Sequence, residues 1–82
     1  MNDMKYVQLD TIQAGASFFL FPSWFDHAEL ARRIAPHAEV LSAGFVSFAS
    51  GKPTCHGKST SLNIGVGEND TKWLKQQMRI EE

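Results

Sequence analysis

The chain has a single cysteine, no cluster of basic residues and no apolar run long enough to cross a bilayer. One cysteine excludes an internal disulfide and is typical of a reducing compartment. Eight scattered basic residues are balanced by nine acidic ones, which argues against duplex nucleic acid or an anionic membrane as a partner. The most apolar segment, residues 14–25, contains Pro22 and lacks the pattern of a signal peptide. We therefore expect a cytoplasmic protein that binds no membrane, and the scattered charges disfavour nucleic acid as its partner.

The composition nevertheless favours a packed core. Of the 82 residues, 43% are hydrophobic and 11% are aromatic, which is typical of a folded domain. A chain of this length forms one domain, residues 1–82, and buries only roughly 60 to 65% of the surface that its unfolded form exposes. We therefore expect a small free energy of unfolding, and small domains are often stabilised further by self-association.

Hydrophobic periodicity and turn residues predict the element order ββαββα. The first helix is expected to begin at Ser23, with Asp26 in its first turn, and to end before Pro36. The last helix is expected to begin at Asn69 or Asp70 and to run to Ile80. The strands are predicted at residues 5–12, 17–21, 39–49 and 54–66, with a turn at 50–53. This order predicts an α+β fold, a two-layer sandwich in which two helices cover one face of an antiparallel sheet of about four strands.

The predicted hairpin of residues 39–66 has two different faces. A turn of two or four residues around Gly51 pairs Phe45 with Lys58, so that one face is the helix-covered core. That core face is formed by Leu41, Ala43, Phe45, Leu62, Ile64 and Val66. The other face sets large apolar side chains beside small polar ones, with no third layer to cover it. Its residues are Val40, Val46, Phe48, Cys55, Ser59 and Ser61, and we expect them to form the interface of a homodimer or of a complex with another protein.

Two nucleotide-binding patterns are incomplete in this hairpin. Residues 44–48, GFVSF, match the second half of an RNA-recognition strand, but the basic residue and the first stacking ring are missing. Gly51 and Gly57 enclose five residues, where a phosphate loop has four, and Pro53 removes an amide donor. Weak binding of single-stranded nucleic acid through Phe45 and Phe48 is an alternative, although an odd spacing places the two rings on opposite faces.

Cys55 and His56 are the remaining candidates for chemistry. In a strand their side chains point to opposite faces, so they cannot share a proton or a metal ion. His37 is the alternative base for a Cys55 nucleophile, but no orienting residue or oxyanion loop can be assigned to this pair. We expect no metal site and no cofactor. A Cys55-dependent enzyme or thiol-reactive protein remains open as an alternative.

Three stretches resemble a known group of proteins: "FP" at 21–22, "VLSAGFVSF" at 40–48 and "CHGKSTSL" at 55–62, followed by a helix that Asp70 begins. The resemblance is to small uncharacterised bacterial proteins carried on mobile gene cassettes of the integron type, and it covers most of residues 18–78. It implies a compact accessory protein and no particular catalytic residue. Together with the apolar second face, it leads us to predict a non-catalytic protein-interaction module that self-associates through a sheet face.

Overall fold

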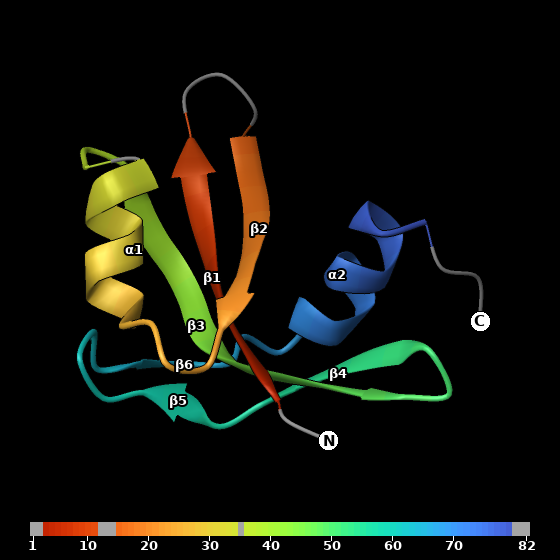
Figure 1. The fold of residues 1–82 in the computed structure, drawn as a ribbon. Helices are drawn as coiled ribbons and strands as arrows, with labels where there is room; N and C mark the ends of the chain where they lie inside the picture. Colours follow the sequence, from red (N-terminus) through yellow and green to blue (C-terminus); the bar gives the residue numbers. More distant parts are fainter. Residues whose placement is uncertain (1–2, 12–14, 35, 80–82) are drawn as a thin grey trace.

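The computed structural model describes residues 3–11, 15–34 and 36–79, and it is built around a four-stranded antiparallel sheet with the order β2-β1-β3-β4 (Figure 1). The strands are β1 (Met4–Thr11), β2 (Gly15–Pro22), β3 (Glu39–Ala49) and β4 (Lys52–His56). The helices are α1 (His27–Ile34) and α2 (Asp70–Gln77). This arrangement confirms the predicted α+β class and the antiparallel four-stranded sheet.

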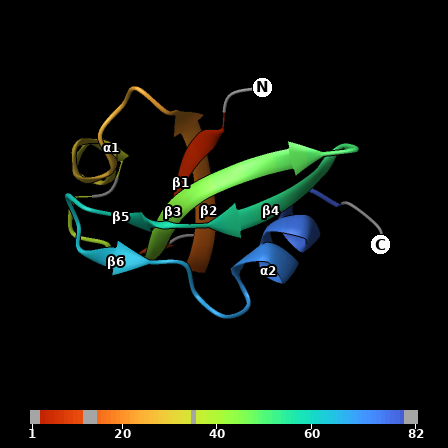
Figure 2. The same cartoon turned by 90° about the horizontal axis from the view of Figure 1, so that it is seen from below.

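The two helices cover opposite faces of the sheet, so the prediction of both on one face was wrong. Tyr6 and Val7 are neighbours on β1 and therefore point to opposite sides. Tyr6 packs in one cluster with Leu74 of α2, and Val7 packs in the other with Ala31 of α1. Figures 1 and 2 show α1 and α2 on either side of the strands. The sheet is the middle of three layers, and each face has its own apolar core.

The chain changes sides of the sheet just before α2. Ile64 belongs to the α1-side cluster, whereas Val66 belongs to the α2-side cluster. The segment that changes sides lies close to Gly44 of β3. A Cβ added there would lie 2.9 Å from Val66 Cγ2 and 2.8 Å from the His56 carbonyl oxygen. Only glycine fits at such a distance. Periodicity alone placed Leu62, Ile64 and Val66 on one face, because it assumed a strand that continues without a break.

The return strand is in fact interrupted. β4 ends at His56, and Gly57 follows with a φ of +76°, a conformation that favours glycine. The chain then forms a small hairpin of its own, with strands β5 (Lys58–Ser59) and β6 (Ile64–Gly65), which lies against β3. The prediction of one strand over residues 54–66 is corrected to these three short strands.

The β3–β4 hairpin closes with a two-residue turn at Ser50 and Gly51, both with positive φ, as tight hairpins require. Phe45 pairs with His56, and the predicted partner, Lys58, is two positions further along. A shift of two positions leaves the faces of a strand unchanged, so Val46 and Cys55 still share a face.

A β-bulge at Leu41 changes the faces at the start of β3. Ser42 pairs with Gln8 but Val40 pairs with Leu9, so Leu41 is the extra residue. Val40 therefore packs in the α1-side cluster, and Leu41 is 41% exposed. The predicted faces of these two residues are reversed, because a bulge breaks the alternation on which the prediction depends.

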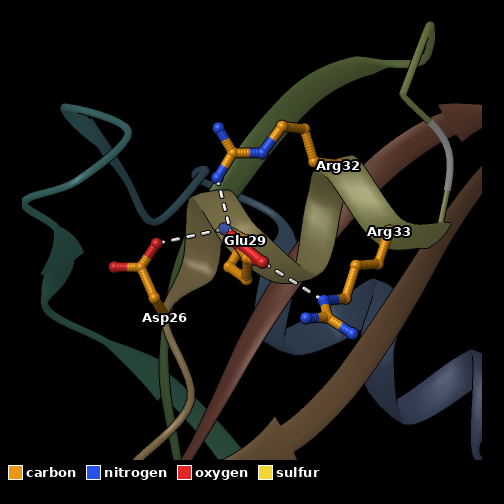
Figure 3. A network of polar contacts seen from close by, with 4 residues as sticks. All are labelled: Asp26, Glu29, Arg32 and Arg33. Carbon is orange, nitrogen blue, oxygen red and sulfur yellow. Dashed lines mark hydrogen bonds and ion pairs between the residues drawn. The ribbon is translucent and has the colours of Figure 1, made fainter.

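α1 begins at His27, four residues after the predicted Ser23. Asp26 caps it, because its Oδ2 accepts the Glu29 N–H at 3.0 Å (Figure 3). The Glu29 carboxylate in turn accepts hydrogen bonds from Arg32 and Arg33 on the outer surface of the helix (Figure 3). The start of α1 is thus fixed by a side chain that was predicted to lie inside the first turn.

Candidate functional site

The six residues predicted to form an interface do not share an open face. Val46 and Cys55 are buried beneath α2, Phe48 packs beside them, and Val40 lies on the α1 side. Ser59 is fully buried, and its Oγ accepts the Leu62 N–H in the β5–β6 turn. Of the six, only Ser61 is exposed. The prediction of a homodimer assumed that this face is uncovered, and α2 covers it.

Cys55 is in an unreactive environment. Its side chain is buried in the apolar cluster beneath α2, and burial raises the pKa of the thiol. The residue's backbone N–H donates to Thr71 Oγ1 at 2.9 Å. His37, the candidate base, is exposed in the segment between α1 and β3, and its neighbour Ala38 packs in the α1-side cluster rather than in the cluster of Cys55. A raised thiol pKa is the opposite of what a nucleophile needs.

His56 lies on the other face, as the alternation in β4 requires, and its ring stacks on Phe45 at a centroid distance of 6.0 Å. Its Nε2 is 2.8 Å from Ser47 Oγ and 2.9 Å from Asp3 Oδ2. Ser47 itself donates to Asp3 Oδ1 at 3.0 Å. The sequence analysis missed this cluster, because Asp3 precedes the first predicted strand and no pattern connects it to the hairpin.

This exposed cluster is not arranged as a catalytic triad. A triad needs one imidazole nitrogen for the serine and the other for the carboxylate. Here the serine hydroxyl and the carboxylate both meet His56 Nε2, and the hydroxyl proton already points to Asp3. The imidazole is therefore not placed to take that proton, and the contacts join the start of β1 to the β3–β4 hairpin.

Phe45 and Phe48 lie on opposite sides of the sheet. Phe45 contacts the rings of His27 and His56 on the α1 side, whereas Phe48 packs against the cluster beneath α2. Two rings on opposite faces cannot stack on successive bases of one strand.

A buried hydrogen-bond network fixes the start of α2. Asp70 Oδ2 accepts the Tyr6 hydroxyl at 2.5 Å and the Gly67 N–H at 2.8 Å, and Asp70 is 1% exposed. Burial raises the pKa of Tyr6, and the hydrogen bond to Asp70 raises it further. The Asp70 residue that was predicted to begin the helix is thus also its attachment to β1.

A concave surface lies between β2 and α2, a groove of about 550 Å³. Among the described residues, none of the lining side chains is ionisable, and the indole ring of Trp73, a residue that is 45% exposed, forms part of the lining. The groove is lined by Gln8, Ala16, Ser17, Phe18, Trp73, Gln76 and Gln77. Uncharged amides beside an exposed aromatic ring suit a neutral ligand with hydrogen-bonding groups.

Gln77 makes an unusual pair of contacts on one side of this groove. Its Oε1 accepts the Phe18 N–H at 2.9 Å, and its Nε2 donates to the Phe18 carbonyl oxygen at 3.0 Å. Phe18 belongs to β2, one of the two edge strands of the four-stranded sheet. The sequence placed Gln77 on the inner side of the last helix, but nothing in it indicated a contact with the backbone of a strand 59 residues earlier.

Comparison with protein-family models, curated proteins and solved structures finds no match for this chain. Within residues 3–11, 15–34 and 36–79, no group of three or more histidine, cysteine or acidic side chains is placed to hold a metal ion. The helices in the same ranges are too short to cross a membrane.

Proposed function

We propose that the protein is a non-catalytic protein-interaction module and that the groove between β2 and α2 is its binding surface. The observation that carries the proposal is the exposed Trp73 ring beside a row of uncharged amides in this groove. Partly exposed aromatic residues are enriched where proteins bind one another, because they bury a large area at little cost in conformational entropy. A second hollow of about 270 Å³ beside α1 is lined mainly by small aliphatic side chains and has no aromatic ring.

The buried thiol favours binding over chemistry. A Cys55-dependent enzyme needs an accessible thiolate, and both the burial and the raised pKa of Cys55 oppose this. Thiol labelling of the folded protein at neutral pH is therefore expected to be much slower than labelling after denaturation. Fast labelling of the folded state would favour the enzyme instead.

A pair of tryptophans provides the test of the binding surface. A display library of random linear decapeptides is selected on the wild-type protein, and the selected peptides are measured against two variants. Trp73→Ala is expected to weaken binding at least about tenfold, because truncation of an aromatic anchor removes much of the binding energy. Trp24→Ala is the matched control, since Trp24 is 79% exposed and is not among the residues that line the groove. Equal effects of the two variants, or no effect of Trp73→Ala, would show that this groove is not the binding surface.

We also propose a cytoplasmic location, because one unpaired cysteine is typical of a reducing compartment. Cell fractionation tests it, and recovery of the protein outside the cell would contradict it.

A further inference from the structure

The outer edge of β2 presents a regular row of backbone groups. In an antiparallel pair, the N–H and C=O of successive residues point alternately toward the partner strand and away from it. Phe18 uses both groups to bind Gln77, on the side away from β1. Residues two positions away have the same orientation, so the backbone groups of Ala16 and Leu20 also point outward. Pro22, the next in this row, has no N–H and ends it.

The side chain of Gln77 occupies the place of a strand residue on this edge. Its carboxamide offers a carbonyl acceptor and an NH2 donor, which stand where the C=O and the N–H of one residue in a neighbouring strand would lie. Its two contacts with Phe18, at 2.9 and 3.0 Å, have the lengths of hydrogen bonds between neighbouring strands. The outward backbone groups of Phe18 thus already bind an amide by two hydrogen bonds.

We propose that an extended peptide segment of a partner protein adds to the outer edge of β2 as a fifth strand and takes over the two hydrogen bonds of Gln77. The inference rests on the proposed function and specifies the ligand of the same groove. Replacement of the Gln77 carboxamide by the C=O and N–H of one peptide residue leaves the number of hydrogen bonds on Phe18 unchanged. The added strand gains further hydrogen bonds at Ala16 and Leu20, which is the usual source of affinity when a strand is added to a sheet edge.

The lining of the groove restricts the side chains of this peptide. Alternate residues of an added strand point to the α2 side of the sheet, where Trp73 and Gln76 lie along the groove. Because the lining residues that the structure describes are all non-ionisable, we expect a segment with uncharged side chains at these positions. Its affinity should depend little on ionic strength, unlike binding that charge attraction drives.

A second copy of the chain fits this edge less well than a single peptide. A two-fold axis through Phe18 would pair β2 with its own copy, in the commonest kind of dimer. Gln77 contacts Phe18 from the last turn of α2, so that turn lies close to such an axis. The two copies of the helix end would then compete for the same space. An isolated peptide strand brings no helix with it and has to displace only the side chain of Gln77.

The decisive experiment methylates the ligand and leaves the protein unchanged. A decapeptide selected on the wild-type protein is synthesised with N-methyl groups on one alternate set of its amides, and then on the other set. Only one set points toward β2, so one methylated peptide is expected to lose at least about tenfold in affinity, while the other loses much less. Equal losses, or no loss from either set, would overturn strand addition, and the Trp73 result would still decide separately whether the groove binds peptides at all.

Four variants of the protein test the same inference by isothermal titration, with circular dichroism to confirm that each one folds. Ala16→Pro removes one outward N–H, and Ala16→Ser, which keeps it, is expected to bind at least about tenfold more tightly than Ala16→Pro. Gln77→Ala removes the competing amide and is expected to strengthen binding several-fold, whereas Gln76→Ala should not strengthen it. Weaker binding by Gln77→Ala would show that this side chain is part of the ligand site rather than its temporary occupant. If light scattering finds a dimer that Ala16→Pro dissociates, the occupant is a second copy and the inference is wrong.

Discussion

The two helices are equal in length, but they are attached to the sheet by different kinds of contact. α1 rests on its face through apolar packing around Ala31 and one buried hydrogen bond, from His27 to the Gly44 carbonyl of β3. Its charged residues bind one another on the outer surface. α2 is held by side-chain hydrogen bonds to three strands. Asp70 accepts one from Tyr6 of β1, and Thr71 accepts one from the Cys55 N–H of β4. Gln77 accepts one from the Phe18 N–H of β2.

This difference matters for binding. Apolar packing tolerates small shifts, whereas a buried polar contact is costly to break because each partner is left without a hydrogen bond. The start of α2 is fixed by a buried carboxylate, but its last turn is attached through the Gln77 amide, which is at the surface. A helix with one firm end and one exchangeable contact suits a site where a ligand displaces a side chain without unfolding the domain.

The largest expected effect is at the firm end of α2. Asp70→Ala leaves the Tyr6 hydroxyl and the Gly67 N–H without their acceptor, and each unsatisfied buried donor costs about 1–3 kcal/mol. We expect the free energy of unfolding, measured with urea, to fall by roughly 2–5 kcal/mol. Asp70→Asn is the control, because it keeps an acceptor oxygen and should lose less. A loss below about 1 kcal/mol for Asp70→Ala would mean that the network does not hold α2.

The second prediction is that ionisation of Tyr6, on the α2 side of the sheet, destabilises the folded protein at alkaline pH. Burial and the Asp70 hydrogen bond raise the pKa of Tyr6 above its ordinary value of 10.0, so the folded state keeps the phenol proton more firmly than the unfolded chain. The contribution of this proton to the free energy of unfolding is fully present below about pH 10 and is lost as the pH rises further. Tyr6→Phe should cost about 1–3 kcal/mol at neutral pH and should lose stability less steeply above pH 10.

Cys55 is the second group that is expected to make the free energy of unfolding fall at alkaline pH, so it serves as the control. Burial raises the pKa of its thiol from 9.0, so it contributes in the same direction from a lower pH. Urea titrations of Tyr6→Phe and Cys55→Ala at a series of alkaline pH values separate the two groups. An unchanged slope in Tyr6→Phe would contradict the assignment to Tyr6.

The third prediction concerns acid and the α1 side. His27 is buried between Phe21 and Phe45, and its Nε2–H donates to the Gly44 carbonyl at 2.8 Å. Desolvation lowers its pKa below 6.5, so the unfolded chain binds a proton that the folded state excludes. Stability should therefore be complete above about pH 6.5 and fall as the pH drops below it. His27→Gln can still donate to Gly44, and its free energy of unfolding, measured with urea, should fall less steeply below pH 6.5. An unchanged pH dependence would point to another group.

The smallest effects are expected on the outer surface of α1. Glu29→Gln removes exposed ion pairs with Arg32 and Arg33, and exposed pairs of this kind contribute little. The melting temperature should barely change, and the change should vanish in high salt. Asp26→Ala should lower it more, because the loss of the cap leaves the Glu29 N–H unpaired. A larger loss for Glu29→Gln than for Asp26→Ala would show that the ion pairs, rather than the cap, hold the helix start.

The candidate site predicted from the sequence depended on a sheet face without a covering layer. An uncovered face was inferred around Val46, Phe48 and Cys55, and the residues do share a face, but α2 covers it. The groove that replaces it depends on Trp73 and Gln77, which the sequence placed on one side of an amphipathic helix without indicating what they contact. No local pattern records that a helix side chain binds the edge of a strand far away in the chain.

The sequence by itself determined the elements whose signals are local: the strands at 4–11, 15–22 and 39–49, the turn at Gly51 and the helix that begins at Asp70. Alternation, glycine at positive φ and helix caps act within a few residues of one another, so they can be recognised without the fold. The tertiary structure decided the rest, namely the bulge at Leu41, the crossing over Gly44 and the side of the sheet on which α2 packs. Each of these depends on contacts between residues far apart in the chain, and such contacts form only when the sheet brings them together.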